Sequence, residues 1–325
     1  MKQAMGIFVL LMVICVGTAI INPNFLSGYN MENTIRWTAL FGIISIGVSF
    51  VIITGGIDLS IGSVCGLSGT LLAYLLTVKG WSIPMALGTV TLVSLAIGLF
   101  HGLLITKMRL QPFVVTLCGL LLYRGLGRYV SDDQSLGFGS DYEGLRQMAI
   151  GSIHLAGDFS IPYPIFIMVA VALLSGFLLQ FTVFGRYLFA LGRNEDAAKY
   201  SGINTDRMVL LSYVICSLLA GFGGMLFALD VNSIQPASMG EFYELYAIAA
   251  AVLGGCSLRG GEGTIIGVVV GAALMRVLYN AINLLRIPTH LEFAIIGTVI
   301  LSGVIIDELV KRWVANRRAR STGLQ

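Results

Sequence analysis

The sequence predicts an all-α membrane protein, a polytopic transmembrane helical bundle of about ten spanning helices with broken or re-entrant elements and both termini cytoplasmic. Three observations support this prediction. Hydrophobic residues make up 56% of the 325 residues and charged residues only 11%, well below the roughly 25% of soluble domains. The 40 glycines suit closely packed spanning helices. Apolar runs close to the roughly 20 residues that cross a bilayer alternate with short polar connections.

The first half of the chain contains six predicted spans within a single transmembrane domain, 1–325. The first follows Lys2 and resembles a secretory signal, but it is long and no small-x-small cleavage site precedes Asn22, so a retained helix is expected. Pro112 suits the start of the fifth span. The six spans cover about 4–21, 37–54, 61–78, 83–105, 113–130 and 162–184.

A double glycine interrupts the chain between the second and third spans. Gly55 and Gly56 break the helix, and Asp58 with Ser60 could cap the next one. An acid close to lipid marks a functional or a buried structural site. Two interpretations therefore remain, a capping turn or a broken-helix element beside a polar path through the membrane, where irregular backbone is tolerated.

The second half contains four predicted spans, at about 208–229, 245–253, 264–282 and 293–306. The eighth is short, and Gly254 and Gly255 interrupt the chain directly after it. Gly-Gly-x-x-Leu thus occurs at Gly55 and again at Gly254, each time after a span predicted to run inward. Interruptions at corresponding positions of two halves are typical of transporters built from structural repeats. Chance, or similar helix packing at the two positions, also explains so short a match.

The charges fit one orientation. With the N-terminus in the cytoplasm, the long acidic loop 131–161 lies outside and the basic clusters lie inside, as the positive-inside rule requires. Arg124 and Arg128 at the outer end of the fifth span are exceptions, which pairing with carboxylates of the outer loop would explain. The inner basic residues are Lys107, Arg109, Arg186, Arg193, Lys199, Arg207 and those of the basic tail 309–325.

The chain shows no catalytic, metal-binding or nucleic-acid-binding pattern. The five cysteines lie in or beside apolar runs without metal-ligand or redox spacing, so neither a disulfide nor a metal site is expected. No G-x-x-x-x-G-K-[ST] loop or HExxH sequence is present, so the chain does not cradle ATP phosphates by that route. A net charge of only +3 does not suggest nucleic acid.

One polar, mixed-charge run, 184–206, separates the sixth and seventh spans. Asn194 suits a helix N-cap, and Glu195 and Asp196 would follow in the first turn. Lys199 lies near the expected C-terminal end and Gly202 at C′. The pattern predicts a short surface helix from Glu195 to Ser201. It is either a docking element for a soluble partner or merely a solvated loop.

Three stretches resemble the ribose-type permeases of ABC sugar transporters, in the branched-chain amino acid/ribose permease superfamily. They are GGIDLSIGS at 55–63, AAAVLGGCSLRGGEGTIIG at 249–267, and the charged run. Together the resemblance covers nearly the whole chain. The charged run carries the family pattern as Gly185, Arg186, Ala190, Gly192, Asn194, Ala197, Ala198, Ser201, Gly202 and Ile203.

The resemblance implies the permease subunit of an ATP-driven importer for a monosaccharide, pentose or hexose, in the bacterial inner membrane. It implies a cytoplasmic ABC ATPase that holds ATP and Mg²⁺, an extracytoplasmic sugar-binding protein, and a second permease copy or a paralogue. The chain itself would bind no cofactor. The ATPase-coupling residues expected within 184–206 are Gly185, Arg186, Asn194, Glu195, Asp196, Ala197, Ala198, Tyr200, Ser201 and Gly202.

The translocation path is expected at the interrupted segments and at polar residues within apolar spans. An ion-gradient-driven secondary transporter is the alternative function; Asp58 would be its main ionisable site and Glu262 the next, although neither has a second carboxylate nearby in the sequence. The expected path residues are Gly55, Gly56, Asp58, Ser60, Thr116, Gly254, Gly255 and Asn280.

Overall fold

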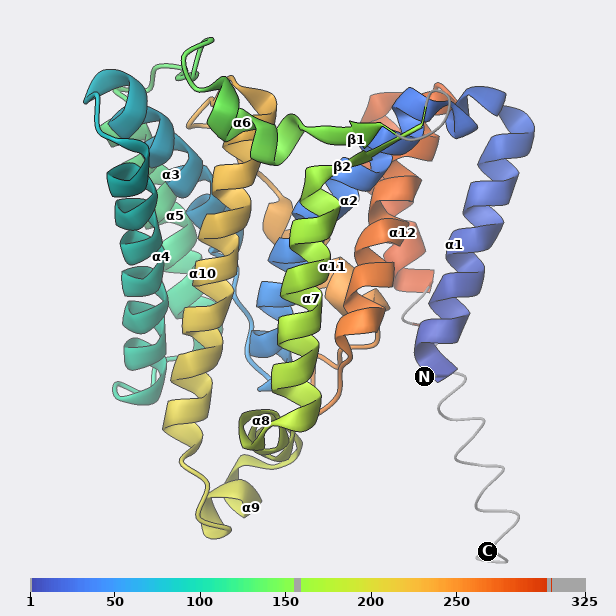
Figure 1. The fold of residues 1–325 in the computed structure, drawn as a ribbon. Helices are drawn as coiled ribbons and strands as arrows, with labels where there is room; N and C mark the ends of the chain where they lie inside the picture. The colour runs from blue at the N-terminus through green and yellow to red at the C-terminus, as the bar shows by residue number, and fades with distance from the viewer. Residues whose placement is uncertain (1, 155–158, 303–304, 306–325) are drawn as a thin grey trace, which may run out of the picture.

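The computed structural model describes residues 2–154, 159–302 and 305, and within them the chain is an all-α bundle (Figure 1). The basic tail 309–325 and the end of the tenth predicted span lie outside the described residues. Seven described helices are long and apolar enough to cross a membrane, and three shorter apolar helices bring the total to ten, as predicted. The long spans are α2 (Gly28–Ile53), α3 (Ile61–Ala73, continued by the π-helical segment Tyr74–Val78), α4 (Ile83–Thr106), α5 (Pro112–Val130), α7 (Tyr163–Phe181), α10 (Thr205–Val231) and α12 (Ile265–Leu284).

The three shorter apolar helices are α1 (Lys2–Ile21), apolar from Gly6 onward, α11 (Tyr243–Leu253) and the helix Glu292–Ser302. Short 3₁₀ turns, Pro23–Leu26 and Thr289–Leu291, join neighbouring elements. Helix α1 lies at one edge of the bundle (Figure 1) and packs mainly against α12.

The core lies where α2, α3, α4 and α10 pack together. Glycine allows this close approach at several crossings. A Cβ at Gly224 of α10 would overlap the backbone of Cys65 on α3, and one at Gly98 of α4 would overlap the backbone of Tyr213 and Val214 on α10. Small residues at these crossings fit the glycine-rich composition, since van der Waals packing holds spanning helices together.

The two glycine interruptions end their helices in the same way. Gly55 has φ +82° and Gly255 has φ +94°. The next amide, of Gly56 or Cys256, donates to a carbonyl five residues back, Val51 or Ala251, which is the glycine-dependent Schellman ending of a helix. The structural equivalence therefore pairs Gly55 with Gly255, whereas the Gly-Gly-x-x-Leu pattern pairs Gly55 with Gly254.

A re-entrant segment follows α10 and explains why α11 is short. The chain turns at Asn232 (φ +54°) and again at Phe242 (φ +62°), where α11 begins. Between these turns its backbone packs against the first turns of α3, so that a Cβ at Gly62 or Gly66 would overlap the carbonyl oxygen of Gly240 or Met239. The broken elements of both halves thus meet inside the bundle.

The outer loop 131–161 is more regular than its polar sequence predicts. It contains α6 (Glu143–Ile150) and an antiparallel pair, β1 (Ser152–His154) with β2 (Ser160–Pro162), which cross one end of the bundle (Figure 1). Arg128 pairs with Asp133 at 2.9 Å, as predicted. Arg124 instead donates to the carbonyl oxygens of Ala237 (3.2 Å) and Met239 on the re-entrant segment, so its predicted pairing with a loop carboxylate is wrong.

Two span boundaries also differ from the prediction. Helix α2 begins at Gly28 rather than near Trp37, because Arg36 pairs with Glu32 one turn earlier on the same helix and its charge stays within a regular helix. Helix α7 ends at Phe181 rather than at Phe184, and Thr182 caps a separate helix, α8 (Val183–Arg193).

Candidate functional site

The charged run forms two short helices, α8 and then α9 (Glu195–Tyr200), which lie below the spanning helices at the end opposite the β1–β2 hairpin (Figure 1). Thr182 begins α8 by accepting a hydrogen bond from the amide of Gly185 at 3.4 Å. A Cβ at Gly185 would overlap the backbone of Leu179, so only glycine permits this turn out of α7.

Helix α9 begins at Glu195, as the sequence predicts, and ends at Tyr200, one residue before the predicted end at Ser201. Capping interactions fix both ends. The Asn194 side chain accepts from the amide of Ala197 at 2.9 Å. Glu195 pairs with Lys199 at 2.7 Å. Gly202 has φ +81° and donates to the carbonyl of Lys199, which ends the helix.

The exposed surface of α9 differs from the predicted one in one respect. The resemblance implies that both Ala197 and Ala198 are among the residues that contact the partner. Ala197 is exposed, but Ala198 is only 4% exposed and faces its own chain. Tyr200, by contrast, is 92% exposed. Large exposed side chains on a short helix are candidate interface anchors, because tyrosine is enriched among binding hot spots.

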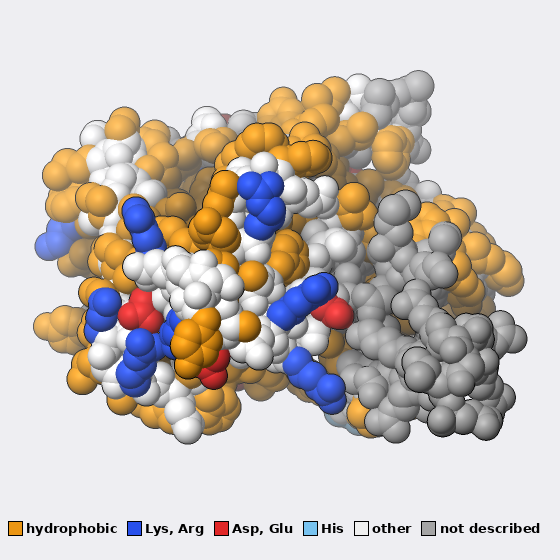
Figure 2. All heavy atoms as spheres, turned by 90° about the horizontal axis from the view of Figure 1, so that it is seen from below, with side chains coloured by type: hydrophobic (Ala, Val, Ile, Leu, Met, Phe, Trp, Pro, Cys, Tyr) orange, Lys and Arg blue, Asp and Glu red, His pale blue; other side chains and the backbone are white. Residues whose placement is uncertain are grey.

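Basic side chains are spread over the face that carries α9, with fewer acidic ones among them (Figure 2). Lys107 and Arg109, after α4, pair with Asp206 at the start of α10 at 3.5 and 3.1 Å. Two connections far apart in the sequence therefore share this face, as the positive-inside argument predicts. The exposed basic residues here are Lys107, Arg109, Arg186, Arg193, Lys199, Arg207 and Arg259.

The three motifs singled out in the sequence meet at one backbone contact. The amide of Gly261, in the connection from α11 to α12, donates to the carbonyl of Ile53 at the end of α2, at 2.8 Å. Gly192 of α8 lies against both, and a Cβ there would overlap the Ile53 oxygen and the Gly261 amide. A Cβ at Gly260 would lie 2.9 Å from the Gly55 amide nitrogen. We call the contact of Gly55, Gly192, Gly260 and Gly261 the glycine junction.

The predicted path residues fall into separate places. Gly55, Gly56, Gly254 and Gly255 end α2 and α11 near the glycine junction. Asp58 is fully buried, and one of its oxygens accepts from both the amide and the hydroxyl of Ser60, at 2.9 and 2.7 Å. The Ser60 side chain makes no capping bond, so the hydrogen bonds to the Asp58 carboxylate hold the turn before α3.

Thr116 and Asn280 stabilise helices. Thr116 is fully buried and donates to the carbonyl of Pro112 on its own helix, at 2.9 Å. Asn280 of α12 exchanges hydrogen bonds with Asn30 of α2, at 2.7 and 3.1 Å. None of the predicted path residues lines the cavity of about 590 Å³ that lies among α2, α11 and α12.

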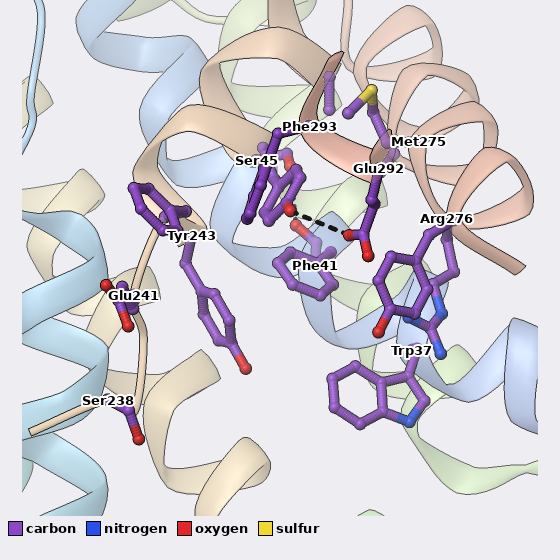
Figure 3. Close-up of a pocket in the computed structure, with 15 residues that line it drawn as sticks. Trp37, Phe41, Ser45, Ser238, Glu241, Tyr243, Met275, Arg276, Glu292 and Phe293 are labelled. Carbon is purple, nitrogen blue, oxygen red and sulfur yellow. Dashed lines mark hydrogen bonds between the residues drawn. The ribbon is translucent and has the colours of Figure 1, made fainter. Parts of the chain in front are cut away.

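That cavity contains residues that the sequence reasoning did not select (Figure 3). Arg276 lies within the apolar run of α12, and a charge inside a span is by default a functional candidate. This signal was present in the sequence. The aromatic lining was not recognisable there, because Trp37, Tyr243 and Tyr246 come from helices far apart in the chain.

All five cysteines are free thiols in the structure. Among the described residues no group of three or more His, Cys, Asp or Glu side chains is placed to hold a metal ion.

Comparisons with known proteins cover nearly the whole chain. Residues 30–304 match the family model described as branched-chain amino acid transport system / permease component. The ribose import permease protein RbsC of Bacillus subtilis (strain 168) is 37% identical over 306 residues, which are 94% of this chain and 92% of that protein.

Two further relatives agree. RbsC of Escherichia coli (strain K12) is 35% identical over 309 residues, 94% of each chain. The xylose transport system permease protein XylH of Haemophilus influenzae (strain ATCC 51907 / DSM 11121 / KW20 / Rd) is 31% identical over 342 residues, covering 89% of this chain and 91% of that protein. No solved structure matches the chain.

Proposed function

Because this multi-pass membrane protein belongs to the family of branched-chain amino acid transport system permease components, we propose that it is the membrane-spanning subunit of an ATP-driven importer for a monosaccharide, a pentose or a hexose. The observation that carries the proposal is the similarity of 94% of the chain to ribose import permeases. We infer a bacterial inner-membrane location, with α9 in the cytoplasm.

The coupling role is assigned to the α8–α9 segment. A cytoplasmic ABC ATPase, which binds ATP and Mg²⁺ itself, would contact the exposed side of α9, with Tyr200 as its anchor and Arg186 and Glu195 at the rim. Closure of the ATPase around ATP would then displace α9 and α8. The glycine junction supports this assignment, because α8 contacts there the end of α2 and the α11–α12 connection.

Alternating access would follow from movement of these helices. Helices α2, α11 and α12 enclose the 590 Å³ cavity, so a shift that starts at α8 reaches three of its walls. An extracytoplasmic sugar-binding protein would deliver sugar at the face formed by α6 and the β1–β2 hairpin. A second permease copy or a paralogue completes the proposed membrane core.

The ion-driven alternative depends mainly on Asp58, with Glu262 as its second candidate. One oxygen of the Asp58 carboxylate accepts hydrogen bonds from Ser60 and so stabilises the turn before α3, which is a structural role. The relatives named above are a ribose import permease and a xylose transport system permease. The importer is therefore the function we propose.

Capture of the cognate ABC ATPase by the tagged permease tests the coupling role. Tyr200→Ala removes a side chain that is 92% exposed, and the matched control Tyr129→Ala removes one that is 84% exposed at the opposite end of the bundle. Neither change should disturb the fold. We expect Tyr200→Ala to weaken ATPase capture by tenfold or more, since hot-spot residues contribute about 2 kcal/mol or more. Failure of the wild type to capture the ATPase would refute the importer proposal.

A further inference from the structure

The cavity among α2, α11, α12 and the helix Glu292–Ser302 is built from aromatic side chains around a few charges (Figure 3). Its volume of about 590 Å³ lies within the roughly 300–1,000 Å³ of small-molecule sites. Glu292, Arg276 and Trp37 lie on one side of it, and Ser238, Glu241 and Tyr243 on the other.

The charged and aromatic end of the cavity lies toward the β1–β2 hairpin, and Ser45 and Ala272 line its deeper end. Trp37 is nine residues from the start of α2, and Arg276 is eight residues from the end of α12. At 1.5 Å per residue these positions are about 12–14 Å from the helix ends. In the proposed orientation, both helix ends are extracytoplasmic, so sugar would meet this cavity before it passes the glycine junction.

The aromatic rings form a packed cluster that exposes ring surface to the cavity. Phe41 lies 4.8 Å from Tyr243 and 6.0 Å from Tyr246, measured between ring centroids. Ring faces of this kind bind the apolar C–H face of a sugar by dispersion, and the hydroxyls at the ring edges hydrogen-bond to a polar ligand. No described hydrogen bond uses the Tyr243 hydroxyl.

Arg276 is held in place by aromatic rings rather than by a carboxylate. Its guanidinium lies 4.7 Å from the ring centroids of both Trp37 and Tyr279. Among the described residues it makes neither a salt bridge nor a hydrogen bond, and its buried Nε has no partner. A guanidinium carries five N–H donors, and burying unpaired donors is costly. The donors are therefore positioned for an acceptor that enters the cavity.

The charge of the cavity selects the ligand class. One guanidinium, Arg276, and two carboxylates, Glu241 and Glu292, line the cavity, and the Tyr246 hydroxyl donates to Glu292 at 3.5 Å. The excess of negative charge disfavours a sugar acid or a sugar phosphate. Carboxylates accept hydrogen bonds from hydroxyl groups, and the guanidinium donates to ring and hydroxyl oxygens. A neutral polyhydroxyl compound satisfies both kinds of group.

We propose that this cavity is a binding site for a neutral monosaccharide in the outer half of the permease. The inference rests on the proposed import function and adds the site. Tyr243 and Tyr246 would contact the C–H face of the sugar, Arg276 would donate to its oxygens, and Glu292 would accept from its hydroxyls. Ser238 lies at an exposed position on the rim.

Saturation-transfer NMR on the purified permease, without ATPase or binding protein, tests this site, since the method detects weak binding. The probes are D-ribose, D-xylose and D-glucose, with gluconate and L-leucine as competing chemistries. We expect signals from at least one of the neutral sugars. Arg276→Met should weaken binding by roughly tenfold or more, because hydrogen bonds to charged groups are the strong ones.

Two further variants make the result specific. Arg286→Met removes an exposed arginine just beyond α12 and should leave binding unchanged. Ser238→Trp fills the cavity from an exposed position, so it should abolish binding even if Arg276→Met fails to fold. Retained binding in Ser238→Trp, or in a folded Arg276→Met variant, would overturn the assignment. A stronger signal from gluconate or L-leucine than from every neutral sugar would overturn the ligand class.

The two proposals fail separately. If the permease captures its ATPase but none of the three neutral sugars gives a signal, the binding site is wrong and the importer stands. If sugar binds at Arg276 but the wild type captures no ATPase, the importer is wrong and the cavity is a sugar site of a different transporter.

Discussion

Replacement of Gly192 by alanine should disrupt the glycine junction. The added Cβ would overlap the Ile53 carbonyl oxygen and lie 3.0 Å from the Gly261 Cα. Neither neighbour is a flexible side chain. The backbone must therefore shift, and the shift breaks the 2.8 Å hydrogen bond from Gly261 to Ile53. Overpacking costs about 1–3 kcal/mol and the lost bond about 1 kcal/mol, so a loss of about 2–4 kcal/mol is expected.

The assay is the thermal unfolding midpoint of the purified permease, read beside the sugar-dependent ATPase activity of the assembled transporter. Gly176→Ala is the matched control, because Gly176 lies within α7 and an added Cβ there would have no neighbouring atom within 4 Å. Alanine within a helix is favoured over glycine by about 0.5–1 kcal/mol. We expect Gly192→Ala to lower the midpoint by several degrees and to reduce coupling, and Gly176→Ala to do neither. Equal midpoints in the two variants would refute the argument from the junction.

Three smaller predictions follow from individual contacts. Asn194→Ala should cost about 1 kcal/mol in the stability of α9, seen as faster hydrogen exchange in that helix alone; unchanged exchange would exclude the cap. The hydrogen bond and charge of Arg128 lower the pKa of Asp133, so the pair stabilises the outer loop above about pH 4 and this contribution is lost as the pH falls through the lowered pKa. The difference in loop hydrogen exchange between wild type and Arg128→Gln should accordingly shrink in acid, and a constant difference would contradict this. Asn30→Leu should cost about 1–3 kcal/mol, because it leaves the buried amide of Asn280 without its partner; Asn280→Leu should cost less, because the half-buried Asn30 keeps its hydrogen bond to the Phe25 carbonyl. The double variant should cost less than the sum in a thermal-unfolding cycle, and additive losses would show that the amides act independently.

The α9 helix was predictable because its signals are local. Asn194 and Gly202 mark the two ends by side-chain oxygen and by positive φ, and both act within the helix they delimit. The inward position of Ala198 was not predictable, because α9 has only six residues and its buried side depends on the packing of α8 and α10 beneath it. Its coupling role stays a prediction.

For the spanning helices, too, some features follow from the local sequence and others depend on residues far apart in the chain. The number of spans follows from hydropathy, but the start of α2 does not, since Arg36 and Glu32 satisfy each other only once the helix exists. The equivalence of Gly55 and Gly255 could be recognised only from their positive φ angles, because the two Gly-Gly pairs can be aligned in more than one way by sequence. The cavity depends on side chains brought together by three helices, and only Arg276 could have been noted in advance as a charge within a span.

The glycine junction consists of backbone meeting backbone. Side chains in a helix interface can rotate about several bonds and absorb a small displacement, whereas each peptide group is planar and cannot rotate about its own C–N bond. We therefore expect a movement of α8 to be passed on to the end of α2 and to the α11–α12 connection. The glycine junction is therefore stiffer than the surrounding contacts between aliphatic side chains. The geometry of its peptide groups, rather than the residues around it, sets how far the contacting segments can move relative to one another.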